Sequence, residues 1–168
     1  MNVTELLAAE LNREVERSRR ALEELPDGKY DWKPHDKSMI LGYLANMVAT
    51  IPSWITMQIN QPELDVAPVA GKMSQKRLET SRDLIEALDR AAAETRAAFA
   101  ATTEEHLMTD WRLLARGQVV QEAPRYLMIE DTISHWSHHR GQMTVYLRLI
   151  GAKVPALFGP SADENKFL

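Results

Sequence analysis

The sequence predicts an all-α fold, a four-helix bundle with long connections that occupies residues 1–168 as a single domain. The chain has 168 residues, a length that suits one hydrophobic core. Apolar residues make up 45% of the chain and recur at helical spacing in four long stretches. Prolines and glycines lie between these stretches and mark their ends. Four amphipathic helices bury their apolar stripes best against one another, which favours a bundle.

The first two helices are expected in the N-terminal third. The first runs from about residue 4 to residue 25 and ends at a Pro-Asp-Gly turn that begins at Pro26. The second begins near Ser38, a suitable N-cap, and carries an apolar stripe from Ile40 to Ile55. Pro52 lacks an amide hydrogen, so it should kink this helix or divide it.

The third helix is expected to begin near Ser74, and its alanine-rich sequence favours helix and close packing. The fourth runs from about Arg125 to Ile150, with Gly151 as the residue that ends it. Two connections are long. Residues 61–73 are expected to form an ordered or mobile crossover. Residues 102–124 contain WRLLARGQVVQ, which fits a small hairpin turning near Gly117 or a loop.

Composition excludes several classes of function. The chain has no cysteine, so disulfides, thiolate nucleophiles and Cys-ligated zinc are ruled out. Its net charge of −4 and pI of about 5.7 argue against nucleic-acid binding, which needs a basic surface. The cluster RSRR ends at Arg20 and is interleaved with glutamates such as Glu14, which indicates a solvated helix face. We expect no membrane span and no secretory signal, hence a cytoplasmic protein.

The stretch HWSHHRGQ, residues 135–142, holds three of the five histidines. His135 and His139 are four residues apart, so both rings can reach one point from the same face of the fourth helix. His138 points about 100° away, toward solvent. Neutral imidazole is a good ligand for zinc, nickel, copper and iron, and a facing helix of the bundle can supply further ligands. Asp131, one turn earlier, could accept a ring N–H of His135.

Two alternatives remain open for this helix. A lone pair of histidines at this spacing also occurs in cores, where a carboxylate or carbonyl satisfies each ring. Arg140 falls near the middle of the apolar arc and needs partners if it is buried. Asp163 and Glu164 in the tail are candidates, which would fix the C-terminus across the bundle. Otherwise Arg140 extends its charge outward to solvent.

Several motifs resemble the DinB-like family. The stretch HHRGQMTVYLRLIGAKVPALFGPSADE covers residues 138–164, MILGYLANMVATIPSW covers residues 39–54, and KYDWKPHDKS precedes the latter. The resemblance implies a four-helix bundle, commonly dimeric. It also implies a divalent metal held by three histidines, one from the second helix and two from the fourth. Some relatives transfer low-molecular-weight thiols, others act as metal-dependent hydrolases, and many have no assigned activity.

The resemblance assigns His135 and His139 as the two ligands of the fourth helix. The ligand of the second helix falls at position 47, where this chain has methionine. A thioether binds Zn²⁺ or Ni²⁺ poorly, and Met47 also fits its helix as core filler. Asn46 is a weak substitute because it points elsewhere on the helix. His35 and His106 are the remaining histidines, and nothing in their spacing brings them to the site.

Two functions are therefore expected, and the sequence leaves open whether the protein is an enzyme. The first is a protein like the divalent-metal-dependent thiol transferases or hydrolases, with Zn, Ni or Mn in a degenerate site and a small thiol as substrate. The second is a metal-free small-ligand-binding or interaction module in which Met47 closes the pocket. A homodimer is expected in both cases, through Trp54, Ile55, Ile59 and the apolar face of the first helix, unless these residues serve the monomer's own core.

Overall fold

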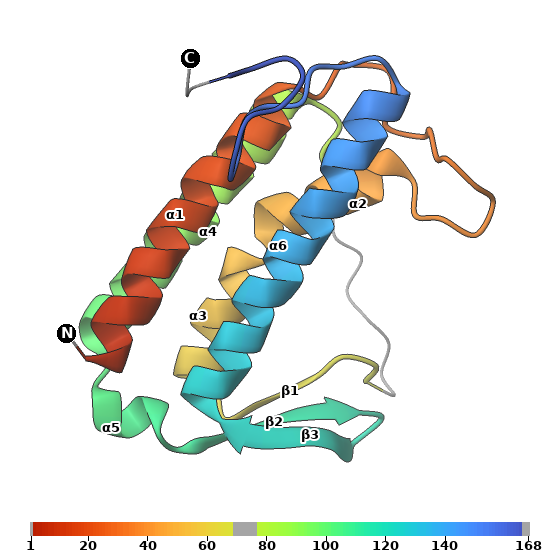
Figure 1. The fold of residues 1–168 in the computed structure, drawn as a ribbon. Coiled ribbons are helices and arrows are strands. Elements are labelled where there is room, and N and C mark those ends of the chain that lie inside the picture. Colours follow the sequence, from red (N-terminus) through yellow and green to blue (C-terminus); the bar gives the residue numbers. More distant parts are fainter. Residues whose placement is uncertain (1, 69–76, 166–168) are drawn as a thin grey trace.

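The computed structural model describes residues 2–68 and 77–165, and most of them lie in a helical bundle (Figure 1). In this part of the chain, helix α1 is followed by the consecutive helices α2 and α3, then by the long helix α4, the short helix α5 and the long helix α6. Their bounds are α1 Val3–Glu23, α2 Leu41–Thr50, α3 Pro52–Asn60, α4 Ser81–Ala101, α5 Glu104–Leu107 and α6 Arg125–Leu149. No helix of the described ranges is long and apolar enough to cross a membrane.

A three-stranded sheet corrects the prediction of an all-α fold. Strand β1 (Glu63–Asp65) pairs in parallel with β2 (Asp110–Ala115), which pairs antiparallel with β3 (Gln118–Pro124). The hairpin within WRLLARGQVVQ is confirmed. Its two turn residues, Arg116 and Gly117, have φ values of 54° and 75°, which favours glycine at the second position. In Figure 1 the sheet lies at the end of the bundle where α6 begins.

Pro52 divides the second predicted helix into α2 and α3. Of the two outcomes expected at this proline, a kink or a division, the structure has the division. Ile51 between them keeps right-handed helical angles, and its N–H donates to the carbonyl of Met47 at 2.9 Å. The helical path therefore continues through the break. Proline is well placed at the first position of α3 because its missing N–H would have no partner in the helix there.

The helix starts differ from two predictions. Helix α2 begins at Leu41 and not near Ser38, because loop carbonyls satisfy its first amides. Leu41 N–H donates to Trp32 O and Gly42 N–H donates to Tyr30 O, both at 2.8 Å. Helix α4 begins at Ser81, capped by the Thr80 hydroxyl. Its predicted start at Ser74 lies outside the described residues.

The core lies between the long helices. Figure 1 shows α1 beside α4, and α6 beside the α2–α3 segment. The apolar face of α1 is buried there, as are Ile55 (0% exposed) and Ile59 (3% exposed) of α3. These side chains, which the sequence offered for a dimer contact, therefore serve the core of the monomer. Gly151 follows α6 with a φ of 77°, as its predicted role in ending the helix requires.

Candidate functional site

Helix α6 runs antiparallel to α2, and two hydrogen bonds set their relative register. The indole Nε1–H of Trp136 donates to the carbonyl of Val48 at 2.8 Å. Nearer the C-terminal end of α6, the hydroxyl of Tyr146 donates to the carbonyl of Met39 at 3.3 Å. Residues in the middle of α2 therefore lie level with the histidine-rich stretch of α6.

His135 and His139 come together on this side of α6. Their ring centroids are 4.4 Å apart. His139 is buried, with 7% of its surface exposed, whereas His135 lies at the exposed edge. The predicted convergence of these two rings is thus present in the structure, with one ring inside the bundle and one at its rim.

The ring of His139 has one satisfied nitrogen and one free nitrogen. Nδ1 lies 2.8 Å from the amide oxygen Oε1 of Gln142. An amide oxygen only accepts, so in the neutral ring this contact places the proton on Nδ1 and leaves the lone pair on Nε2. This Nε2 is buried and has no hydrogen-bond partner among the described residues. Metal-ligating histidines commonly have this arrangement, in which one nitrogen is fixed by a hydrogen bond and the other is free to bind.

The environment of His135 favours its neutral form. Burial lowers the pKa of His135 from the ordinary 6.5, and the neighbouring His139 lowers it further, while the charge of Asp131 acts in the opposite direction. No hydrogen bond between Asp131 and His135 is found in the described part of the chain, so Asp131 acts through its charge and not as the predicted ring partner. Trp54 of α3 packs against the ring, with centroids 5.7 Å apart.

His138 is exposed, as predicted for a residue on another face of α6. Its ring nevertheless lies near that of His139, with centroids 5.4 Å apart in an edge-on arrangement. The orphaned nitrogen of His139 remains without a partner, so His138 does not satisfy it. His138 therefore serves as a natural control for experiments on the other two histidines.

The described part of the chain brings no third nitrogen or carboxylate donor to the two histidines. Within residues 2–68 and 77–165, no group of three or more His, Cys, Asp or Glu side chains is arranged to hold a metal ion. His106 is bonded through Nε2 to the carbonyl of Ile59 at 2.8 Å. His35 accepts from the amide of Lys37 at 3.1 Å in the exposed loop before α2.

Asn46, the neighbouring candidate on α2, has another role. Its side-chain amide donates to the carbonyls of Gly42 (2.8 Å) and Leu78 (3.0 Å), and its oxygen accepts from Leu78 N–H at 3.1 Å. It therefore anchors the segment that leads into α4. Met47 is half-buried against the core and lies level with the two histidines, given the register of α2 and α6.

The side chains at this site thus fit a metal ion in part. Two imidazoles converge, and one of them has a buried lone pair with no protein partner. They fall short of the three-nitrogen set that the sequence resemblance implies, because a thioether occupies the third position. Two nitrogen donors alone leave a weaker site than a set of three.

The opposite side of α6 carries a buried ion pair. Arg140 (1% exposed) pairs with Glu14 of α1 (2% exposed) and also donates to the Ser18 hydroxyl at 3.2 Å and the Ser137 hydroxyl at 3.0 Å. The prediction that Asp163 or Glu164 pairs with Arg140 is wrong. The prediction of a solvated face on α1 fails at Glu14 and Ser18, which are both buried.

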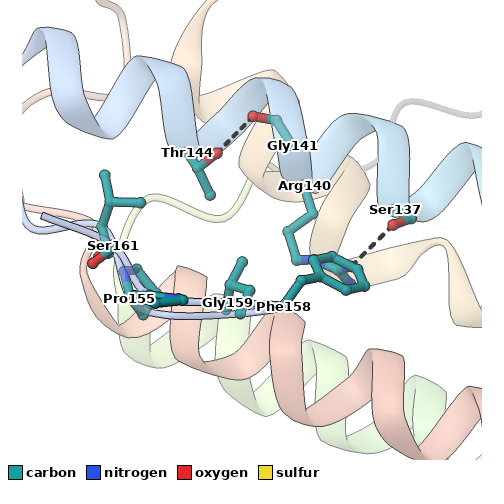
Figure 2. A pocket seen from close by; sticks show the side chains of 11 residues that line it. Ser137, Arg140, Gly141, Thr144, Pro155, Phe158, Gly159 and Ser161 are labelled. Carbon is teal, nitrogen blue, oxygen red and sulfur yellow. Dashed lines mark hydrogen bonds between the residues drawn. The ribbon is translucent and has the colours of Figure 1, made fainter. Parts of the chain in front are cut away.

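The two tail acids still hold the C-terminal segment against the bundle. Asp163 pairs with Arg148 of α6, and Glu164 pairs with Arg20 of α1. Between this segment and α6 lies a cavity of about 220 Å³ (Figure 2). Arg140 and Ser137, joined by a hydrogen bond, lie on its α6 side, and the Phe158 ring lies over the guanidinium groups of Arg17 (4.0 Å) and Arg140 (5.5 Å).

Three residues of this region were not assigned to it from the sequence, although Trp54 and Glu14 were considered for other roles. Gln142 follows His139 by three positions, a spacing that places both on one helix face, so its role could have been read from HRGQ. Trp54 and Glu14 reach α6 from other helices. Only the tertiary packing brings them there, and helical periodicity alone gives no signal for it.

Comparisons with known proteins bear on this fold. The family model described as DinB family matches residues 1–166. The solved DinB-like protein YjoA of Bacillus subtilis has a TM-score of 0.68 and 18% identity, over 89% of this chain and 96% of that one. A DinB-like protein from Bacillus cereus ATCC 10987 has a TM-score of 0.65 and 21% identity, over 86% and 90%. At these identities the likeness shows the fold alone.

A curated relative is similar over a shorter stretch. The uncharacterized protein YrdA of Bacillus subtilis (strain 168) is 43% identical over 44 residues, which is 26% of each chain. The match thus spans about a quarter of that relative.

Proposed function

Because this chain belongs to the DinB family, we propose that His135 and His139 hold a divalent metal ion in a degenerate form of a metal centre. The metal would be Zn, Ni or Mn. The activity would be of the class of metal-dependent thiol transfer or hydrolysis, with a small thiol or another small molecule as substrate. Met47 stands where the third ligand would be, so this site would bind metal more weakly than a three-histidine site.

The observation that carries this proposal is the convergence of two imidazole rings, those of His135 and His139, on a nitrogen of His139 that has no protein partner among the described residues. A buried polar atom without a partner costs about 1–3 kcal/mol, so folded proteins rarely keep one without a reason. Gln142 fixes the tautomer that leaves the Nε2 lone pair available. His135 supports the proposal because its lowered pKa favours the neutral, ligating form of the ring.

The chain's own residues would hold and orient the reactants. When bound, the metal supplies Lewis acidity and lowers the pKa of a water or thiol that shares its open positions. Gln142 would orient the His139 ring, and Trp54 would cover the His135 ring on the side toward α3. A thiol substrate would bring the thiol group that this cysteine-free chain lacks.

The test is the metal content of protein purified without an affinity tag, followed by titration with Zn²⁺, Ni²⁺ and Mn²⁺. The proposal predicts that His139→Ala weakens the metal binding of the wild-type protein by about tenfold or more, while His138→Ala preserves it. Less than about a tenth of an equivalent in the wild type, with none gained on adding metal, would refute it.

A second function is favoured by the missing third donor. In this alternative the protein is metal-free and serves as a small-ligand-binding or interaction module, with no catalysis. The half-buried Met47 would then close the site with apolar surface. The variant Met47→His separates the two functions, since metal affinity that appears only in this variant identifies the natural protein as the metal-free form.

We also propose that the protein forms a homodimer. The residues first considered for the contact are buried in the core, except for Trp54, which is half-buried. Exposed apolar side chains on α2 and α6, Tyr43 (55%), Val145 (57%) and Leu149 (59%), are better candidates. Sedimentation at several concentrations tests this, and the double variant Val145→Glu/Leu149→Glu should shift the protein to monomer.

A further inference from the structure

Met47 and Trp54 lie on the same side of the α2–α3 segment. They are seven residues apart, which is close to two full helical turns. The break at Pro52 does not interrupt this relation, because Ile51 keeps right-handed helical angles and bonds to the carbonyl of Met47. Trp54 contacts the ring of His135, with centroids 5.7 Å apart. The side of the segment that carries Met47 is therefore the side near the two histidines.

The register of α2 against α6 places Met47 level with the histidine-rich stretch along the bundle axis. Val48, its neighbour, receives the hydrogen bond from Trp136, which lies between His135 and His139 in sequence. Met47 is half-buried, as expected for a side chain at the boundary between α2 and α6. Face and height together direct the side chain of Met47 toward the part of α6 that carries the two histidines.

The donors gathered here are soft and uncharged. They comprise the two imidazoles that converge on α6, which bind metal ions in their uncharged form, and one thioether. The described residues offer no carboxylate or thiolate that completes a three-donor group. Thioether ligands select Cu(I) among the common metal ions, whereas carboxylates favour harder ions. A single positive charge is also less costly to hold in a half-buried site without a counter-charge.

We propose that Met47, His135 and His139 together form a site for Cu(I), and that methionine at position 47 changes the metal preference of this centre. The proposal rests on the proposed function in so far as it uses the same two histidines. It differs from it in the metal and in giving the sulfur of Met47 a ligating role. The exchange of one nitrogen for sulfur thus alters which ion the site retains.

The experiment measures Cu(I) affinity of the metal-free full-length protein under anaerobic conditions, by competition with a chromophoric Cu(I) chelator. Met47→Leu keeps an apolar side chain of similar size and removes the sulfur. We expect it to weaken Cu(I) binding by about tenfold or more, the usual cost of losing a ligand or its support. Met108→Leu is the matched control, because Met108 is exposed after α5, at the far end of the bundle. It should bind as the wild type does.

X-ray absorption at the copper edge gives a second readout that stability changes do not affect. Wild-type protein should show sulfur and nitrogen scatterers, and Met47→Leu should show nitrogen alone. Equal Cu(I) affinity in wild type and Met47→Leu, or absence of sulfur from the wild-type spectrum, overturns the inference.

Zinc binding distinguishes failure of this inference from failure of the proposed function. If His139→Ala loses Zn²⁺ while Met47→Leu keeps Cu(I), the two-histidine centre stands and the sulfur ligand is refuted. If His139→Ala retains all metal binding, both are refuted. Met47→His should reverse the preference, with Zn²⁺ affinity raised by about tenfold or more and Cu(I) affinity lowered.

Discussion

The two sides of helix α6 carry similar polar groups in opposite states. On the side toward α1, Arg140 is buried and contacts three partners. It pairs with Glu14 and donates to the hydroxyls of Ser18 and Ser137. Toward α2 and α3, His139 is buried with one ring nitrogen bonded and the other without a partner. Both sides are polar and enclosed. On the α1 side the buried charges pair with each other, whereas on the other side Nε2 of His139 has no partner among the described residues.

This difference separates a structural site from a candidate binding site. A buried charge that meets its counter-charge and further donors needs nothing from outside the chain. A buried lone pair without a partner loses free energy that a ligand would recover. Burial and polarity alone would therefore have selected both sides. Glu14 Oε2 has the Arg140 guanidinium as its ion-pair partner, whereas Nε2 of His139 has neither a hydrogen-bond nor an ion-pair partner among the described residues, and this selects the histidine side.

The largest expected effect on stability comes from breaking the buried ion pair between Arg140 and Glu14. Arg140→Met leaves the buried carboxylate of Glu14 with Arg17 as its remaining ion-pair partner, so the free energy of unfolding should fall toward the lower end of about 3–5 kcal/mol. The double variant Glu14→Leu/Arg140→Met removes both charges and should recover most of that loss. Urea unfolding measures both. A loss below about 1 kcal/mol in the single variant would show that the pair is not enclosed in solution.

The next largest effect concerns metal affinity at His135 and His139. His139→Ala should reduce metal affinity by about tenfold or more, because it removes the buried nitrogen donor. Gln142→Ala, which removes the partner of Nδ1, should have the same direction and a smaller size. Isothermal titration measures both affinities. Metal binding that is unchanged in both variants would contradict the assignment of this side as a binding site.

A smaller effect is expected from pH. The folded state lowers the pKa of His135 below the ordinary 6.5, so the unfolded state binds more protons between the folded pKa and 6.5. The contribution of His135 to stability is thus complete above 6.5 and is lost as the pH falls toward its folded pKa. His135→Gln should flatten this part of the stability profile, measured by urea unfolding with a chelator present. Identical profiles for variant and wild type would contradict it.

The smallest effect is expected at the tail. Arg148 and Asp163 form an exposed pair, with side chains 47% and 27% exposed. Arg148→Ala should cost at most about 1 kcal/mol, and the cost should shrink in high salt because exposed charges are screened. Thermal unfolding at low and high salt measures this. A loss as large as that of Arg140→Met would mean that the tail contributes as much as the buried pair.

The sequence predicted those features that depend on local pattern. Apolar periodicity located the four long helical segments, Pro52 marked the division of the second, and the glycine in ARGQ marked the hairpin. The spacing of His135 and His139 predicted that their rings meet. Each of these follows from helical or turn geometry within a few residues.

The features that were missed depend on distant partners. Strand β1 has three residues, too short for a pattern, and exists because β2 offers it a parallel edge. Glu14 looked like one of several exposed charges on α1, and its burial follows from Arg140, which lies 126 residues further along the chain. The unbonded nitrogen of His139 is likewise visible only in the packed structure.

The parallel pairing of β1 with β2 has a consequence for how the chain folds. The hairpin β2–β3 needs only a two-residue turn, but β1 is separated from β2 by all of α4 and α5. Closing so long a loop costs entropy that is recovered only after the intervening helix has docked. The amide of Val66, which donates to Leu114 at 2.9 Å, should therefore gain protection from hydrogen exchange later than the hairpin amides. Until then β2 presents an unpaired edge that can pair with a strand of another chain during folding.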